Sequence, residues 1–379
     1  MQQAPDSVAG VRNTSIFNRN DRAVIGWYWA LASRELGRGE VTAARVLGRD
    51  LVVYRGEDGV AQAMDAYCPH MGAHLAEGRV DGNALRCFFH DWKFARDGGC
   101  VEVPCLPKPP RARVKVWPTA ERYGLVWVWT GPEDAVGELP YVPELRDAEC
   151  DALLGNRFVK NCHPNVVLIN AIDEHHFNSV HDLPVDLRME TRRVSRTVQT
   201  YSNATLPPDS AFGRLLRRFY RGPLTYSMAY HYGSSGTVTL GPDALHFHIM
   251  FALRMIDGGR TEGQTVLITQ RRGGVSGRAK NRLLLRLTEV VGNYFAKGDT
   301  QVFQTMKFDF QTPTRADHAI IDFIQHVEAQ PAMAWGSWEA VDDSDLEAHG
   351  VIPCDPVSDA GGDRSVGGRA RIHLEVVSG

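Results

Sequence analysis

The stretch of sequence that decides the fold contains two short cysteine–histidine pairs, Cys68-Pro69-His70 and Cys87-Phe88-Phe89-His90. Each pair offers one thiolate and one imidazole from the same short loop. Thiolates bind soft metals and iron–sulfur clusters, and imidazole suits zinc and iron. Two such loops that face each other would therefore surround one metal centre with two sulfur and two nitrogen ligands.

Two kinds of centre could be bound by this ligand set. A zinc site is tetrahedral and usually pairs cysteine with cysteine and histidine with histidine at the two ends of its spacing. The alternation C-x-H … C-x-x-H is instead typical of a Rieske [2Fe–2S] cluster, in which both cysteines bind one iron and both histidines bind the other. The sequence thus favours a Rieske cluster with four ligands, which are Cys68, His70, Cys87 and His90.

A second group of metal-binding residue types follows much later in the chain, as Asp173-x-x-His176-x4-His181. Two histidines and one carboxylate on one face of a metal form the facial triad of non-haem Fe(II) oxygenases, which leaves coordination positions open. On a regular helix Asp173 and His176 share a face, but His176 and His181 differ by roughly 140°. We therefore expect the helix to bend, bulge or end near residues 178–181. The alternative is a polar helix whose histidines face solvent.

The composition excludes several classes of protein. The 379 residues are 43% hydrophobic and 23% charged, which is ordinary for a globular chain long enough for two domains. A net charge of −3 gives no reason to expect nucleic-acid binding, and no stretch approaches the ~18 apolar residues of a membrane span. The start of the chain lacks the basic and apolar segments of a secretory signal. Seven cysteines without a disulfide-like framework indicate a reducing compartment, so we expect a cytoplasmic protein.

The pattern of strands and turns predicts an α+β protein. Residues 23–131 read as short antiparallel strands, including a hairpin around Gly48-Arg49-Asp50, and rigid strands suit the display of two loops at a fixed separation. Residues 1–22 are expected to be a leader, residues 132–341 a helix-and-strand domain, and residues 342–379 an irregular tail.

Both cysteine–histidine loops resemble the cluster loops of Rieske non-haem iron oxygenases, in the oxygenase (alpha) component. The likeness covers residues 68–75 and 87–94, and more diffusely residues 26–330. Met71 and Asp91 stand where the family commonly has Arg and Gly, and they resemble the ketosteroid 9-alpha-hydroxylase type of monooxygenase. The resemblance implies an amino-terminal antiparallel β domain for the [2Fe–2S] cluster, followed by a helix-grip-like α+β catalytic domain.

The second group is also similar to the iron-site motif of this family. The resemblance implies that His176 and His181 bind a mononuclear Fe(II). It makes Asp173 a carboxylate that bridges the iron site to the cluster of a neighbouring subunit, and it places Asn170 near the iron. Asp299 matches the family's late aspartate, a third iron ligand that usually opens a helix. The residues that could replace a ligand in this set are His175, Asp309 and Asp257.

The resemblance implies an O2-dependent enzyme. The expected reaction is monooxygenation, that is hydroxylation, of a hydrophobic polycyclic or natural-product substrate. Dihydroxylation, demethylation, desaturation and oxidative cyclisation on the same iron site stay open. Electrons would come from NAD(P)H through a separate reductase, with or without a ferredoxin, and pass between the subunits of a homotrimer. A Rieske electron-transfer or redox-sensing protein is the alternative from another class.

Two further features have competing interpretations. His246 and His248 lie on one face of an apolar strand predicted over residues 245–253, where they could contact substrate or be hydrogen-bonded within a sheet. The basic stretches 214–221 and 271–286 could attract an acidic ferredoxin, although the sequence favours solvated helix faces as their explanation.

Overall fold

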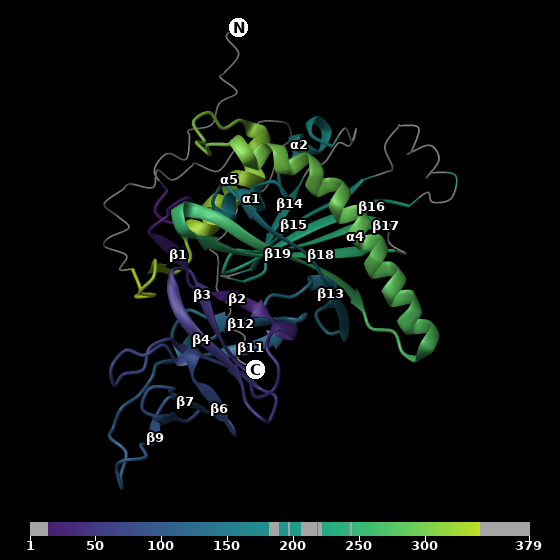
Figure 1. The fold of residues 1–379 in the computed structure, drawn as a ribbon. Coiled ribbons are helices and arrows are strands. Elements are labelled where there is room, and N and C mark those ends of the chain that lie inside the picture. The colour runs from purple at the N-terminus through teal and green to yellow at the C-terminus, as the bar shows by residue number, and fades with distance from the viewer. Residues whose placement is uncertain are drawn as a thin grey trace, which may run out of the picture.

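A computed structural model describes residues 14–181, 189–195, 198–205, 218, 222–242 and 245–341, and every structural statement below concerns these residues. Three predictions lie outside them in whole or in part: the leader before residue 14, the basic stretch 214–221 apart from residue 218, and the tail 342–379. Small β-sheets occupy one end of the described chain, and a large sheet with helices occupies the other (Figure 1).

Short antiparallel strands build the amino-terminal half of the fold, as predicted. They form three sheets, with the strand orders β10-β5-β4-β3, β11-β12-β2 and β6-β7-β8-β9. The strands are β2 (Trp27–Ala32), β3 (Val41–Val46), β4 (Arg49–Arg55), β5 (Ala61–Asp65), β6 (Arg79–Asp81), β7 (Ala84–Arg86), β8 (Lys93–Phe94), β9 (Cys100–Glu102), β10 (Val116–Trp117), β11 (Thr119–Arg122) and β12 (Leu125–Trp129).

The predicted hairpin is confirmed, but its turn begins one residue earlier than expected. Val46 of β3 pairs with Arg49 of β4, so the loop consists of Leu47 and Gly48 instead of Gly48-Arg49-Asp50. Both loop residues have positive φ, 45° and 77°, which is the conformation that a two-residue turn of matching twist requires. Only the glycine of the pair adopts it without steric cost.

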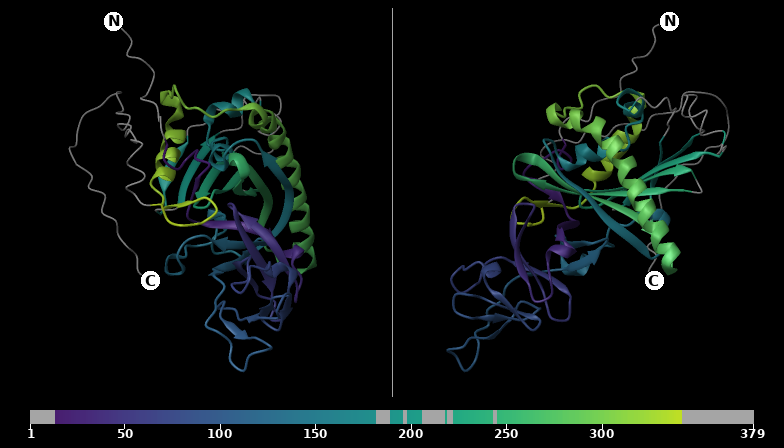
Figure 2. Two further views of the ribbon diagram at one scale, coloured as in Figure 1. Left: turned by 60° about the vertical axis from the view of Figure 1, so that its left-hand side comes forward. Right: turned by 45° about the vertical axis from the view of Figure 1, so that its right-hand side comes forward.

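A seven-stranded antiparallel sheet forms the second half of the fold, with the order β13-β19-β18-β17-β16-β15-β14. Its strands are β13 (Cys150–Lys160), β14 (Glu190–Arg193), β15 (Val198–Thr205), β16 (Leu224–His231), β17 (Ser235–Pro242), β18 (Phe247–Ile256) and β19 (Arg260–Gln270). The helices are α1 (Pro164–Ile169), α2 (Glu174–Ser179), α4 (Gly274–Thr305) and α5 (His318–Glu328). The long helix α4 crosses one face of the sheet, and β2 lies against the other (Figures 1 and 2). This mixture confirms the α+β class.

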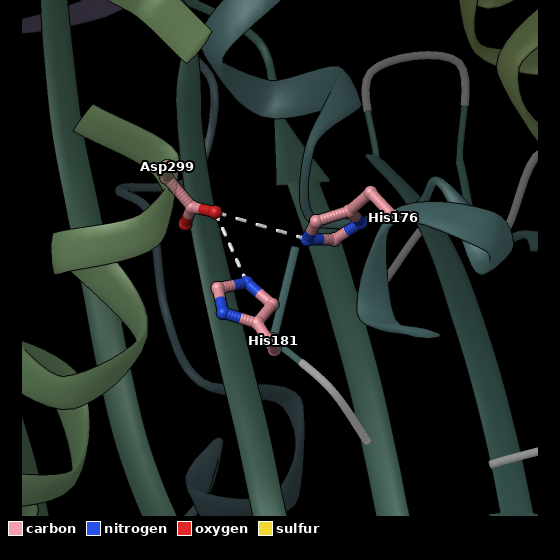
Figure 3. Close-up of side chains that lie close together, drawn as sticks. All are labelled: His176, His181 and Asp299. Atoms are coloured by element: carbon pink, nitrogen blue, oxygen red, sulfur yellow. Dashed lines mark ion pairs between the residues drawn. The ribbon is translucent and has the colours of Figure 1, made fainter. Parts of the chain in front are cut away.

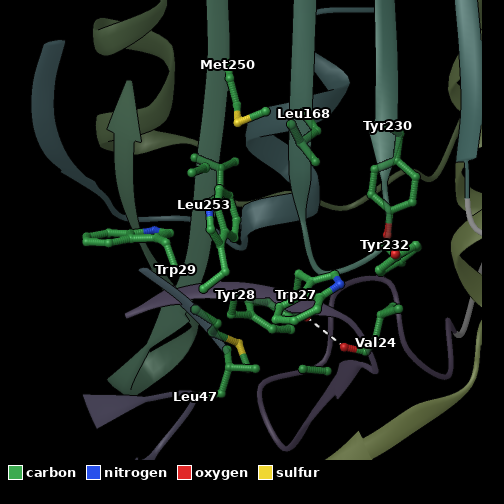
Figure 4. Packing of buried hydrophobic residues seen from close by; sticks show 14 of the residues in the cluster. Val24, Trp27, Tyr28, Trp29, Leu47, Leu168, Tyr230, Tyr232, Met250 and Leu253 are labelled. Atoms are coloured by element: carbon green, nitrogen blue, oxygen red, sulfur yellow. Dashed lines mark hydrogen bonds between the residues drawn. The ribbon is translucent and has the colours of Figure 1, made fainter. Parts of the chain in front are cut away.

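The strand β2 lies at the centre of the core that joins the two halves. All six of its residues are buried, because β2 pairs with β12 in its own sheet and also packs against β18 of the large sheet. Figure 4 shows Trp27, Tyr28 and Trp29 of β2 beside Leu253 of β18 and Tyr230 of β16. Each such aromatic side chain buries on the order of 150–250 Å² of surface, so this strand supplies much of the apolar contact between the halves.

A buried ion pair adds a polar connection at the same place. The side chain of Arg254 on β18 is only 7% exposed, and its Nη2 lies 2.7 Å from Glu262 Oε2 on β19. Its Nη1 donates hydrogen bonds to the main-chain carbonyls of Trp29 and Ala30, and its guanidinium lies 4.0 Å from the Trp29 ring centroid. Arg254 therefore links the large sheet directly to the backbone of β2.

The two ends of the described chain also meet. β1 (Arg22–Val24) pairs antiparallel with β20 (Ala332–Ala334). Just before β1, the carboxylate of Glu328 at the end of α5 accepts the main-chain N–H groups of three successive residues, which are Ser15, Ile16 and Phe17. Charge-assisted hydrogen bonds of this kind are about twice as strong as neutral ones, so they fix the amino-terminal segment on α5.

We expect Arg254→Met to lower the free energy of unfolding by about 3–5 kcal/mol. The change leaves Glu262 without its most buried partner and leaves the carbonyls of Trp29 and Ala30 without donors. Urea unfolding followed by circular dichroism measures the loss. The matched control is Arg271→Met, which removes an ion pair with Asp151 at the exposed edge of the sheet and should cost much less. Equal losses in the two variants would contradict this role for Arg254.

Candidate metal centres

The first predicted cluster loop is a tight turn closed by two main-chain hydrogen bonds. The Cys68 N–H donates to the carbonyl of Ala73, and the Gly72 N–H donates back to the carbonyl of Cys68, both at 2.9 Å. Gly72 has a φ of 73°, so the turn depends on a left-handed residue at this position. The loop follows β5 and holds the Cys68 side chain toward the protein interior.

The second loop repeats this geometry with a different residue at the left-handed position. The Cys87 N–H donates to the carbonyl of Trp92 at 2.9 Å, and the Asp91 N–H donates to the carbonyl of Cys87 at 3.1 Å. Asp91 has a φ of 58° and is the counterpart of Gly72. Aspartate is one of the few residues that adopt this conformation, and its carboxylate also pairs with Arg79 Nη2 at 2.5 Å.

The four predicted cluster ligands lie on two distinct sides of these loops. Cys68 and Cys87 are almost fully buried, whereas His70 and His90 are exposed. The two imidazole rings face each other with 4.6 Å between centroids, and Trp92 stacks on His70 at 4.5 Å. The structure therefore brings the four residues together, with both sulfurs inside and both imidazoles outside.

This arrangement fits a cluster whose two metal ions have different ligands. Burial is the main reason why the pKa of the Cys68 thiol is raised to about 11, and the neighbouring Cys87 contributes to this rise. A buried thiol of this kind gives up its proton when a bound metal stabilises the thiolate. A [2Fe–2S] cluster held by Cys68 and Cys87 on the inner iron, with His70 and His90 on the outer iron, uses both sides of the site.

The second predicted group lies at the other end of the molecule, around the short helix α2. This helix ends at Ser179. His181 therefore lies in the turn beyond the helix, and helical spacing does not fix its direction relative to His176. The prediction that the helix must bend, bulge or end between His176 and His181 is confirmed. Both histidines are buried, and their ring centroids are 5.1 Å apart.

Asp173 has a structural role that the sequence reasoning did not assign to it. It is the N-cap of α2, where its Oδ1 accepts the N–H groups of His175 at 2.9 Å and of His176 at 3.3 Å. Its main-chain carbonyl also lies 2.7 Å from Nδ1 of His176. A proton on that Nδ1 satisfies the carbonyl and leaves the Nε2 lone pair of His176 available for a metal.

Asp299 completes the group from the other side (Figure 3). Its Oδ1 lies 3.0 Å from Nε2 of His181 and 3.9 Å from Nε2 of His176. Within the described chain, these three residues are the set of possible ligands whose donor atoms all lie within 4.8 Å of one another. The expectation that Asp299 opens a helix is wrong, because it lies far inside α4 and reaches the histidines from the helix face that covers the sheet.

The chemistry of these three side chains fits an iron(II) site. Asp299 Oδ1 is buried and has no well-aligned hydrogen-bond donor among the described residues. Burial lowers the pKa of His181, Asp299 opposes that effect, and the neighbouring His176 adds to it. His181 is therefore favoured as a neutral imidazole, which is the form that binds metal. Two imidazoles and one carboxylate are the donor set of a non-haem Fe(II) centre.

Two residues missed by the sequence reasoning shape this site. Gly298 lies in the interior of α4, where a Cβ would be 2.9 Å from Val180 Cγ1 and 3.4 Å from ring atoms of His181. Lys160 on β13 donates to Thr300 Oγ1 at 2.7 Å, one residue beyond Asp299. The sequence contains no clear signal for this close approach, because the expectation that Asp299 opens a helix placed Gly298 before the helix and not inside it.

The other candidate ligands lie elsewhere. Asn170 is the C-cap of α1 and makes no described side-chain contact with the three ligands, and His175 is exposed on α2. Asp257 faces Arg45 at 3.7 Å, and Asp309 contacts Gln311, so neither joins the group. The role of Asn170 near the iron therefore stays a prediction.

His248 lies on the face of the sheet opposite the iron site. Its neighbour Ile249 points toward α4, and successive strand residues point to opposite faces. The His248 Nδ1 is 2.9 Å from the hydroxyl of Thr239, which donates to Glu144 at 2.9 Å. This geometry supports the interpretation of His248 as a hydrogen-bonded sheet residue. It does not support a contact between His248 and a substrate.

Comparison with known proteins identifies the part of the chain that holds the first candidate centre. Residues 26–118 match the Rieske [2Fe-2S] domain family. A probable 3-ketosteroid-9-alpha-monooxygenase oxygenase component of Rhodococcus rhodochrous is 36% identical over 182 residues, which are 46% of this chain and 46% of that protein. Cholesterol 7-desaturase nvd of Bombyx mori is 38% identical over 160 residues, 41% of this chain and 35% of that protein. The match thus spans half or less of the length of these relatives.

The likeness in fold extends beyond that region. The structure of NdmA with caffeine, from Pseudomonas putida CBB5, superposes with a TM-score of 0.61 at 19% identity, covering 79% of this chain and 88% of that one. The chain has the domain and the fold of a Rieske oxygenase. The Rieske domain implies a [2Fe–2S] cluster. None of the helices in the described ranges has the length and apolar character needed to cross a membrane.

We expect Gly298→Ala to weaken Fe(II) binding by about tenfold or more, since the added methyl group displaces Val180 and the His181 ring. The Rieske domain is remote from this change and should keep its cluster. Iron titration of the chain, with the visible spectrum of the cluster recorded in parallel, measures both effects.

The control is Gly292→Ala on the same helix, where within 4 Å a Cβ meets only Cδ1 of Ile249, the movable end of a side chain. Both substitutions improve helix propensity by about 1 kcal/mol. Unchanged iron affinity in Gly298→Ala would show that the close approach to His181 is not needed.

Proposed function

We propose that this chain is the oxygenase component of a multicomponent Rieske system, and that it hydroxylates an apolar substrate with O2. The observation that carries the proposal is the presence of two different candidate iron centres in one chain. A Rieske domain alone needs only residues 26–118, whereas His176, His181 and Asp299 form a second donor set beyond it.

When bound, the cluster and the Fe(II) would each supply one electron for the reduction of O2. Cys68, Cys87, His70 and His90 would hold the cluster, and His176, His181 and Asp299 would hold the iron. Asp173 would orient His176 through the contact between its main-chain carbonyl and the Nδ1 atom. Three protein ligands leave coordination positions open, which is the condition for O2 to bind beside a substrate.

An apolar substrate fits the surroundings of the iron residues. Phe177 lies 6.0 Å from His181 and 5.1 Å from Tyr226, measured between ring centroids; Phe177 belongs to the core, and Tyr226 packs against it. Burial raises the pKa of the Tyr226 hydroxyl far above its ordinary value, and that hydroxyl donates to the carbonyl of Ala171. The relatives named as ketosteroid monooxygenase and cholesterol desaturase support a polycyclic, sterol-like substrate class.

The placement of the two centres supports transfer of electrons between subunits. The cluster loops adjoin β6 to β9 at one end of the chain, and α2 lies at the opposite end (Figure 1). We therefore include a homotrimer in the proposal, in which the cluster of one subunit lies beside Asp173 of the next. A separate NAD(P)H-dependent reductase, with or without a ferredoxin, would supply the electrons. A cytoplasmic location agrees with the six described cysteines, which are all free thiols.

Desaturation is the second candidate reaction, favoured by the likeness to cholesterol 7-desaturase. The same metal ligands would serve it, because the position of the substrate relative to the iron decides the outcome. An electron-transfer or redox-sensing protein is the alternative from another class. It would need no mononuclear iron, and therefore no ligand set such as that of His176, His181 and Asp299.

Metal analysis and turnover test the proposal together. The intact chain should contain three irons and two sulfides, as one cluster plus one iron requires. His176→Ala should lose one iron, keep the cluster spectrum and lose activity. With a generic reductase, NADH and 18O2, a panel of sterols and other polycyclic compounds should give a product that has gained one labelled oxygen atom. Two irons per chain, with no effect of His176→Ala, would favour the electron carrier. A product lacking two hydrogens would favour desaturation.

Asp173→Asn separates the two roles proposed for Asp173. Asparagine caps helices as well as aspartate does, so α2 and the iron content should be retained. The charge is lost, and we expect turnover to fall by about tenfold or more while each centre keeps its spectrum. Asp173→Ala is the comparison, since it also removes the cap and should lower iron content. Full turnover in Asp173→Asn would exclude the bridging role.

A further inference from the structure

Lys160, the last residue of β13, reaches α4 beside the candidate iron site. Its Nζ donates a hydrogen bond to Thr300 Oγ1 at 2.7 Å, and that hydroxyl donates to the carbonyl of Ala296 at 2.7 Å. Thr300 follows Asp299 directly in the sequence. The amine of Lys160 is therefore held close to the residue that supplies the carboxylate of the site, although it is not one of the three candidate ligands itself.

The surroundings of Lys160 stabilise its protonated form. Thr300 uses its own hydroxyl hydrogen on a main-chain carbonyl, so its oxygen accepts the hydrogen bond from Lys160. The Lys160 Nζ also lies 5.6 Å from the ring centroid of Phe158 and 5.8 Å from that of Phe303, distances at which a cation is attracted to an aromatic ring. Burial lowers the pKa of Lys160, and the carboxylate of Asp299 opposes that effect. The nitrogen therefore carries a positive charge at a defined position near Asp299.

Such a charge affects the two oxidation states of a bound iron unequally. The two neutral imidazoles and the one carboxylate of the candidate site contribute a single negative charge. The site would then carry one positive charge with Fe(II) and two with Fe(III). A neighbouring ammonium repels the Fe(III) site more strongly, because the Coulomb energy is proportional to the product of the charges. Partial burial of Lys160 strengthens this difference, since partly buried charges are screened less than exposed ones.

We propose that Lys160 favours Fe(II) over Fe(III) at the candidate iron site, because it holds a fixed positive charge beside Asp299. This inference rests on the proposed function, since it requires iron at that site. The proposed reaction starts from Fe(II), so a residue that favours this oxidation state keeps the resting site ready for O2. The competing role for Lys160 is mechanical, in which its hydrogen bond to Thr300 holds β13 against α4 and its charge has no effect on the iron.

A potentiometric titration of the full-length, metal-loaded chain tests this role without turnover. Electron paramagnetic resonance follows it, because high-spin Fe(III) and the reduced [2Fe–2S] cluster give separate signals. In Lys160→Met we expect the ratio of the Fe(III) to the Fe(II) binding constant to rise about tenfold. That change lowers the midpoint potential of this one-electron couple by about 59 mV. The cluster loops lie at the other end of the molecule, so the cluster should keep its potential (Figure 1).

Three further variants separate the charge from the hydrogen bond. Lys160→Gln removes the charge but keeps a donor for the Thr300 hydroxyl, so it should lower the potential of the iron as Lys160→Met does. Lys160→Arg keeps the charge and should leave the potential near that of the unaltered chain. The matched control is Lys280→Met, which removes an exposed cation from α4 about 30 Å from Asp299 along the helix and should have no effect. Circular dichroism establishes that each variant is folded.

The outcomes distinguish this inference from the proposed function. An unchanged iron potential in both neutral variants, with the third iron retained, would overturn the inference alone. A shift in Lys160→Met but not in Lys160→Gln would assign the effect to the hydrogen bond and would also overturn it. Loss of iron from a folded neutral variant would contradict it as well, because removal of a repelling charge should strengthen the binding of both oxidation states. Absence of a third iron from the unaltered chain would overturn the proposed function, and this inference with it.

Discussion

The packing of α4 across the large sheet is the contact on which the candidate iron site depends. His176 and His181 come from a short helix and the turn after it, and neither position fixes a metal alone. Asp299 reaches them only because α4 lies against β13, β18 and β19, with Leu285 packed on Ile249 and Leu267. The absence of a side chain at Gly298 then lets the helix approach His181 closely enough for Oδ1 and Nε2 to lie 3.0 Å apart.

Local motifs could be predicted from the sequence, and contacts between distant segments could not. The cysteine–histidine pairs lie in short loops whose spacing determines their geometry, so it could be predicted that these four residues lie together. The end of α2 before His181 followed from helical angles alone. Asp299 was recognised by resemblance, but its place inside a 32-residue helix was not, because nothing near it in the sequence specifies the partner across the sheet. The capping role of Asp173 was not predicted, because it depends on where α2 begins, and the bridging role of Asp173 stays a prediction.

The structure explains why Asp91 can stand where the resembling cluster loops commonly have glycine. Its position requires a left-handed backbone, as Gly72 shows in the matching loop. An aspartate can occupy it because its carboxylate is paired with Arg79, and Arg86 donates to its main-chain carbonyl at 3.1 Å. The loop beside His90 is thus stabilised by charge where the other loop relies on glycine.

Side chains along β16, β17 and β18 alternate between the two faces of the sheet, so substitutions on one face would have different consequences from substitutions on the other. Tyr226, Leu240 and Phe247 are cross-strand neighbours on the face toward the iron, whereas Ser227, Thr239 and His248 form the polar row behind it. Substitutions at the first set would alter the apolar side chains on the face of the sheet that carries the candidate iron site. Those at the second would alter how the sheet is joined to Glu144 and the segment before it. The apolar face could therefore change in evolution without disturbing the hydrogen bonds that join the sheet to Glu144.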